Sequence, residues 1–118
     1  MILEMTKEQT IKLIKGYYKI NEKMDVDVKF DTFTSYYGDF NRQSLINTNI
    51  IVEAKKEILN EVFEFNYKLD MEDTKKILKT LLLEQIDFDE MDIRYNINRS
   101  EQFEGLTVNV KSKQKVKN

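Results

Sequence analysis

The chain has 118 residues, a size typical of one domain with its own hydrophobic core. It is 41% hydrophobic and 34% charged, and its formal net charge of −2 gives no overall preference for nucleic acids or acidic membranes. The chain contains no Cys and no His, which excludes disulfides, thiolate nucleophiles, a His general base and the usual ligands of zinc. Its three glycines are too scattered for a phosphate-binding loop. We therefore expect a protein that is not an enzyme and that carries no cofactor.

No apolar run exceeds three residues, so the sequence predicts neither a transmembrane helix nor a signal peptide. We accordingly expect a cytoplasmic protein. Residues 1–111 are predicted to form a single α+β domain. Residues 112–118 are rich in Lys and are predicted to form a flexible basic tail.

The N-terminal part of the chain predicts a loose segment followed by a helix. Met1–Met5 is short and apolar, and we expect it to pack loosely or fray. Thr6 and Gln9 have the spacing of a capping box, so a helix should begin there and run to about Asn21. The inward face of this helix should consist of Ile11, Ile14, Tyr17 and Tyr18.

Apolar and polar residues alternate through the next part of the chain, as in half-buried strands. We interpret Val26–Tyr36 and Arg42–Lys55 as one long hairpin, with Gly38 and Asp39 in its turn. Phe33 breaks the alternation and is predicted to mark a bulge or a change of the buried face.

The segment Val52–Phe63 fits two structures. Its apolar spacing and Ala54-Lys-Lys-Glu57 suit a helix, whereas Asn60 suits a turn between two strands. The alternation that follows in Glu61–Leu69 requires a strand partner, so we favour the turn and a meander of three strands.

The pattern changes to helical spacing at Asp70, which is a natural N-cap for a helix that extends to Ile86. A polar connector, Asp87–Asp92, is then followed by alternating residues from Met91 to Ile97 and by a short strand after Gly105. The predicted fold is α+β: an antiparallel sheet of about five strands with two helices packed on one face, in the order α-β-β-β-α-β-β. Its core should include Phe63, Phe65, Tyr67 and Leu81, which would make this central stretch a scaffold.

The turn of the long hairpin is the candidate partner-binding site. Tyr, Phe and Arg are enriched at interaction hot spots, and a turn needs none of them. The candidate residues are Tyr36, Tyr37, Phe40 and Arg42. In the alternative interpretation Tyr36 and Phe40 complete the core. The leading hypothesis is a small protein-interaction module, such as an accessory or mobile-element protein that acts on a larger protein.

The second hypothesis is binding of nucleic acid. The order helix, three strands, helix resembles the double-stranded-RNA-binding domain, in which a Lys-Lys-x-Ala-Lys motif contacts phosphates. Lys75-Lys76-Ile77-Leu78-Lys79 resembles that motif, with Leu78 in place of the small residue. Three acidic residues in the first turn of the same helix would repel phosphates. The candidate contacts are Lys12, Lys15, Lys19, Lys75, Lys76 and Lys79.

A metal site is the weakest of the three hypotheses. Asp87, Asp89, Glu90 and Asp92 bring four carboxylates together, which is the chemistry that Mg²⁺ and Ca²⁺ prefer. The positions that an EF-hand loop needs after Asp87 do not match, because Asp92 stands where the loop requires Gly. We interpret the cluster as a solvated acidic loop and assign no metal site.

Overall fold

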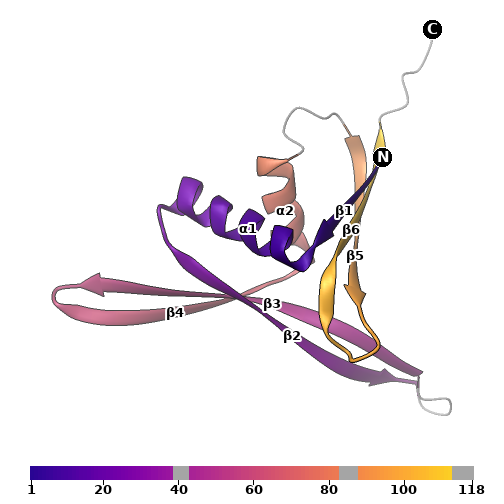
Figure 1. The fold of residues 1–118 in the computed structure, drawn as a ribbon, viewed down its shortest axis with the longest axis horizontal. Coiled ribbons are helices and arrows are strands. Elements are labelled where there is room, and N and C mark those ends of the chain that lie inside the picture. Colours follow the sequence, from indigo (N-terminus) through magenta and orange to yellow (C-terminus); the bar gives the residue numbers. More distant parts are fainter. Residues whose placement is uncertain (39–42, 83–87, 113–118) are drawn as a thin grey trace, which may run out of the picture.

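The computed structural model describes residues 1–38, 43–82 and 88–112. It is an α+β fold with two α-helices and two three-stranded antiparallel sheets (Figure 1). In chain order the elements are β1 (Ile2–Thr6), α1 (Lys7–Tyr17), the π-helical turn η1 (Tyr18–Glu22), β2 (Val26–Tyr37), β3 (Gln43–Ile58), β4 (Glu61–Leu69), α2 (Met71–Leu81), β5 (Phe88–Ile97) and β6 (Phe103–Ser112).

The prediction of one five-stranded sheet is corrected to two separate sheets. One has the strand order β2-β3-β4 and the other has the order β1-β6-β5. The reason lies at the N-terminus, where Met1–Met5 does not fray but supplies most of β1. Leu3 and Met5 pack toward the core, and the strand pairs with β6 from Ile2, opposite Asn109, to Thr6, opposite Gly105. With β1 in place, β5 and β6 complete a sheet without joining the first one.

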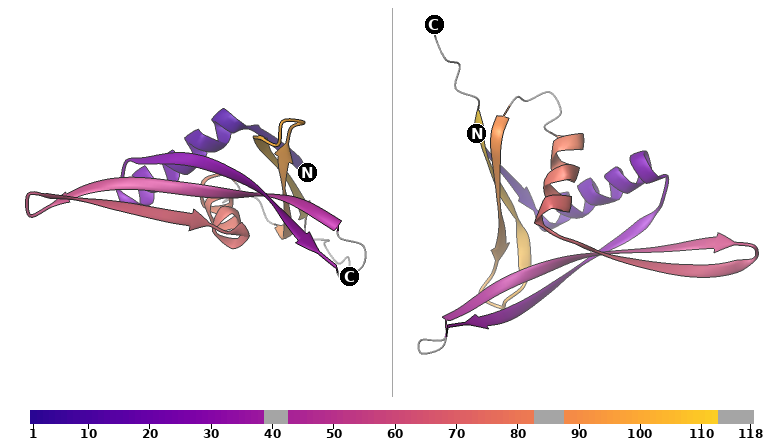
Figure 2. Two further views of the ribbon diagram at one scale, coloured as in Figure 1. Left: turned by 90° about the horizontal axis from the view of Figure 1, so that it is seen from below. Right: turned by 180° about the vertical axis from the view of Figure 1, so that it is seen from behind.

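The two helices occupy the angle between the sheets (Figure 2). The predicted capping box of α1 is confirmed, since the Gln9 backbone N–H donates to Thr6 Oγ1 at 3.1 Å and the Thr6 N–H donates to Gln9 Oε1 at 2.9 Å. The predicted N-cap of α2 is also confirmed, because the Asp73 N–H donates to Asp70 Oδ1 at 2.8 Å. Helix α1 ends earlier than predicted, at Tyr17, where η1 takes over.

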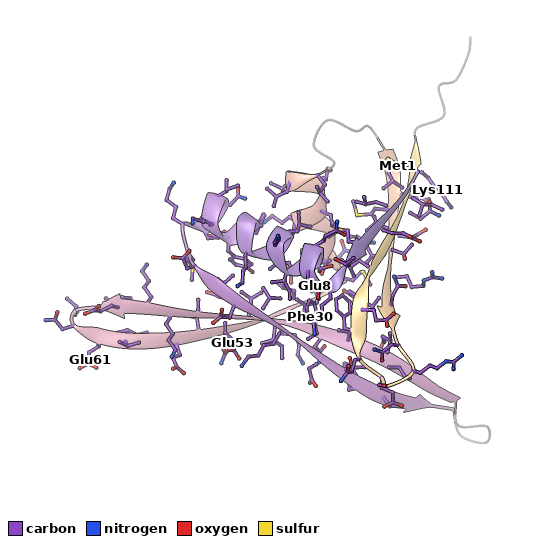
Figure 3. All side chains as sticks on the ribbon, viewed as in Figure 1. Met1, Glu8, Phe30, Glu53, Glu61 and Lys111 are labelled. Carbon is purple, nitrogen blue, oxygen red and sulfur yellow. The ribbon has the colours of Figure 1, made fainter. Side chains whose placement is uncertain are left out.

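Each sheet has its own hydrophobic core, and the helices contribute to both. Leu78 packs with β1, β5 and β6, whereas Ile14 and Ile77 pack on β2, β3 and β4. The rings of Phe30 and Phe103 stack with centroids 4.0 Å apart where the sheets meet, a position that Figure 3 labels at Phe30. Burial is therefore concentrated in the angle between the sheets.

The long hairpin and the meander are confirmed, and their register runs without interruption. Phe33 lies opposite Asn47 with no register shift, so the predicted bulge is absent and Phe33 is simply on the uncovered face, 40% exposed. The ambiguous segment Val52–Phe63 continues β3 to Ile58, turns at Leu59 and Asn60 and returns as β4. Strand β5 begins at Phe88, earlier than predicted, because the residues that we assigned to a polar connector extend the strand.

Candidate interaction surface

The end of the β3–β4 hairpin projects beyond the rest of the sheet. Strand β2 begins at Val26, opposite Ala54, so from Lys55 onward β3 has β4 as its sole strand partner among the described residues. We call residues 55–64 the arm. Figure 1 shows it extending past the end of α1, and Figure 3 labels Glu61 at its far end. All ten of its residues are exposed.

Four apolar side chains of the arm face solvent. Leu59 is 91% exposed, Val62 64%, Phe63 47% and Ile58 40%. The prediction that Phe63 and Tyr67 belong to the core is therefore wrong, since Tyr67 is also 43% exposed. The alternation of β4 does place its aromatic residues on the face that the helices cover near Leu69. The helices end before the arm begins, however, so no part of the described chain covers that face near Phe63.

The turn of the arm is the least expected feature of the sequence. Leu59 and Asn60 have φ angles of 53° and 64°, so the two-residue loop is a type I′ turn. Such turns favour Asn, Asp and Gly, and Asn60 fits this preference. Leu59 does not, because a bulky side chain in the left-handed region costs about 1 kcal/mol. Leu59 is thus unfavourable for both the backbone and the solvation of the isolated chain.

Strand β4 also offers an open edge. It is the last strand of its sheet, it is nine residues long, and it pairs with β3 without a register shift. The edge strand β5 of the other sheet differs, because its pairing with β6 is interrupted twice. Register interruptions, prolines and short length are three common means of preventing an edge from pairing with another chain, and charged side chains, which β4 does carry at Glu61, Glu64 and Lys68, are a fourth. Strand β4 has none of the first three, so its backbone edge is regular.

A groove of about 790 Å³ lies at the base of the arm. Its lining carries mixed charges: Lys15 Nζ lies 3.9 Å from Asp27 Oδ1, and Lys55 Nζ lies 3.6 Å from Glu64 Oε1. Gly16 is also part of the lining, and a Cβ added there would meet no atom within 4 Å. The fold itself therefore does not require a glycine at this position of α1.

The lysines of the nucleic-acid hypothesis do not come together on one surface. Lys15 and Lys19 line the groove at the base of the arm, together with Asp25, Asp27, Glu53 and Glu64. The lysines of α2 line a different hollow, of about 510 Å³, between α2 and β5. That hollow contains as many acidic as basic residues: Glu72, Glu90 and Asp92 beside Lys75, Lys76 and Lys79. Neither place has the clustered positive charge that phosphate binding normally uses.

The aromatic turn of the β2–β3 hairpin stays a prediction. Tyr36 and Tyr37 form the end of β2, which lies at the opposite end of the sheet from the arm. Phe40 and Arg42 lie outside the described residues.

Among the tyrosines whose side chains the structure describes, Tyr18 and Tyr95 have raised pKa values. Burial raises the pKa of Tyr95, whose hydroxyl lies 4.0 Å from Met71 Sδ. Burial also raises the pKa of Tyr18, and the nearby carboxylate of Asp73 adds to the effect. The Tyr18 ring stacks on Tyr67 with centroids 6.4 Å apart. In both tyrosines burial disfavours the ionised form.

Within the described ranges, no group of three or more acidic side chains is placed to hold a metal ion. Of the predicted acidic cluster, Asp87 lies outside those ranges, and Glu90 forms an ion pair with Lys111 at 3.4 Å. In the part of the chain that the structure covers, no helix is long and apolar enough to cross a membrane. Comparison with protein-family models, with curated proteins and with solved structures finds no match.

The arm was missed by reasoning from the sequence, although one signal was available. Leu59 and Asn60 occupy the two-residue loop between alternating strands, and an apolar residue at such a turn is out of place. The exposure of Phe63 had no comparable signal, since it depends on how far the helices reach.

Proposed function

We propose that the protein is a small, non-enzymatic protein-interaction module and that the arm is its contact surface. The observation that supports this most directly is Leu59, which is 91% exposed at the turn and has a φ angle of 53°. Leu59 costs the isolated chain stability through its left-handed backbone and through its solvent-exposed apolar side chain. A contact with another molecule would give a reason for a leucine at this position. Phe63 and Ile58 add exposed apolar surface on one face of the hairpin beside the turn, and Val62 adds it on the other face.

The composition of the arm suits a small hydrophobic anchor in a larger interface. Exposed apolar residues that occur singly are ordinary, but contiguous groups mark sites of interaction. Ion pairs such as Lys55–Glu64 flank the apolar residues, which resembles the polar rim around an interface core. The four apolar residues of the arm would anchor the contact, and the charged residues around them would orient it.

The test uses a substitution that improves the fold and removes the anchor. Leu59→Asn places a residue suited to the type I′ turn at the position, so the free energy of unfolding should rise by up to about 1 kcal/mol. Binding should fall at the same time. Ile20→Asn is the matched control, because it makes a similar change at an apolar residue that is 65% exposed and belongs to η1 rather than to the arm.

The measurement is crosslinking of the purified chain in extract of the source cells, followed by mass spectrometry of the crosslinked residues. We expect crosslinks from the wild type and from Ile20→Asn to include Lys55 and Lys56, which lie on the arm. They should be lost in Leu59→Asn. Equal crosslinking of arm residues in all three proteins would contradict the proposal.

A further inference from the structure

The open edge of β4 identifies a specific partner for the arm. We propose that a second copy of this chain pairs with β4, antiparallel and around a two-fold axis, to join two three-stranded sheets into one of six strands. This inference rests on the proposed function of the arm and names its partner. It follows from the direction of the backbone groups, the order of the charges and the aromatic face of β4.

The backbone of β4 presents its free groups at regular intervals. The two-residue turn is closed by the pair Ile58 and Glu61, whose backbone groups bond to each other across the loop. Because bonded and non-bonded pairs alternate along an antiparallel ladder, the backbone groups of Glu64, Asn66 and Lys68 point to the open edge. A second β4 strand can bond to these groups without disturbing the pairing with β3.

The order of side chains selects one register. A two-fold axis normal to the sheet keeps the same faces together, so even-numbered residues of one copy lie opposite even-numbered residues of the other. When Asn66 lies opposite Asn66 of the second copy, Glu64 lies opposite Lys68, and the symmetry repeats this pair. A register centred on Glu64 would place the two copies of Glu64 opposite each other. A register centred on Tyr67 would place Glu64 opposite Asp70 of the second copy. Both registers bring like charges together.

The same register aligns the aromatic residues on the other face. Phe65 then lies opposite Tyr67, and Phe63 lies opposite Leu69, each pair occurring twice. Phe63 and Tyr67 are 47% and 43% exposed in the single chain, so pairing would remove apolar surface from water on both copies. The competing register centred on Phe65 places Glu64 opposite Asn66 and loses both charge pairs.

The other exposed edges are less suited to a second copy. Strand β2 meets the second sheet where Phe30 stacks on Phe103. Strand β1 has only five residues, and β5 has an irregular register. In the favoured register the turn of one copy extends past the end of β4 in the other, toward the beginning of its helix α2. This position would give Leu59 a contact on the second copy.

The experiment measures the mass of the full chain by analytical ultracentrifugation across a wide range of concentrations. The wild type should change from 14.2 kDa to twice that mass as concentration rises. Asn66→Pro removes an N–H that points to the open edge and leaves the pairing with β3 intact, so it should abolish the dimer. Circular dichroism checks that the variant folds.

Charge variants provide a second and independent test. Lys68→Glu would place a glutamate opposite Glu64 in both symmetric pairs of the dimer. The dissociation constant of the dimer should therefore rise about tenfold or more. Adding Glu64→Lys to the same chain should restore most of the affinity. Lys12→Glu makes the same change of charge on α1 and should have little effect.

The outcomes separate this inference from the proposed function. A wild type that stays monomeric at millimolar concentration overturns the dimer, as does a dimer that Asn66→Pro and Lys68→Glu leave unchanged. If the chain is monomeric but Leu59→Asn still abolishes crosslinks to another protein, the arm remains a contact surface with a different partner. If Leu59→Asn changes no crosslink and no self-association is found, both proposals fail.

Discussion

Substitutions along one face of the β3–β4 hairpin should affect stability very unequally. Leu69 is 7% exposed and packs beneath the helices, so Leu69→Ala should lower the free energy of unfolding by about 2–5 kcal/mol. Phe63, on the same face of the same strand, is 47% exposed. About half of its side chain is buried, so Phe63→Ala should cost about 1 kcal/mol. Leu59 is 91% exposed, and Leu59→Ala should cost less than about 0.3 kcal/mol.

Urea denaturation followed by circular dichroism measures all three variants against the wild type. The first series uses a protein concentration at which analytical ultracentrifugation finds the monomer, so the values report the fold alone. The measurement is then repeated at high concentration, where Phe63→Ala should become more costly if Phe63 faces a second copy. If Phe63→Ala costs as much as Leu69→Ala at low concentration, the arm is packed against the chain, and our reasoning about its exposure is refuted.

Four further predictions follow from single features. Gly105→Ala should destabilise the fold by at least about 1–3 kcal/mol, because its Cβ would overlap the Met5 carbonyl in the β1–β6 pairing. Gly16→Ala should instead stabilise α1 by up to about 1 kcal/mol. Thermal denaturation compares both variants with the wild type, and equal changes in stability would contradict the contrast between the two glycines. Since burial raises the pKa of Tyr18 and Tyr95 above the ordinary value of about 10, the stability from their neutral forms should be complete below that pH and decline as pH rises through the raised pKa values. The difference between the absorbance titrations of the wild type and of Tyr95→Phe reports the ionisation of Tyr95, and a midpoint at the ordinary value of about 10 would contradict the raised pKa of Tyr95. Duplex RNA should show no measurable binding by fluorescence anisotropy at low salt, because five of the six candidate lysines line hollows that also contain carboxylates. Strong binding that weakens steeply with salt would favour the nucleic-acid hypothesis.

Local chemistry made several elements predictable from the sequence. The capping residues Thr6 and Asp70 begin their helices where side-chain oxygens can bond to free backbone N–H groups. Strands β2 to β4 followed from the alternation of apolar and polar residues, and Asn60 identified the turn between β3 and β4. Each of these features depends on residues within a few positions of one another.

The sequence by itself therefore determined the α+β class, both helices and most strands, because the spacing of apolar residues and the capping of helices are local properties. Only the tertiary structure decided that Met1–Met5 pairs with β6, a contact between the two ends of the chain, and that the strands divide into two sheets. It also decided the exposure of Phe63. Alternation assigns a residue to a face of a strand, but whether that face is covered depends on the length and position of helices elsewhere. The arm is exposed because β3 and β4 extend beyond the helices, which cover the middle of their sheet around Ile50 and Leu69 (Figure 1).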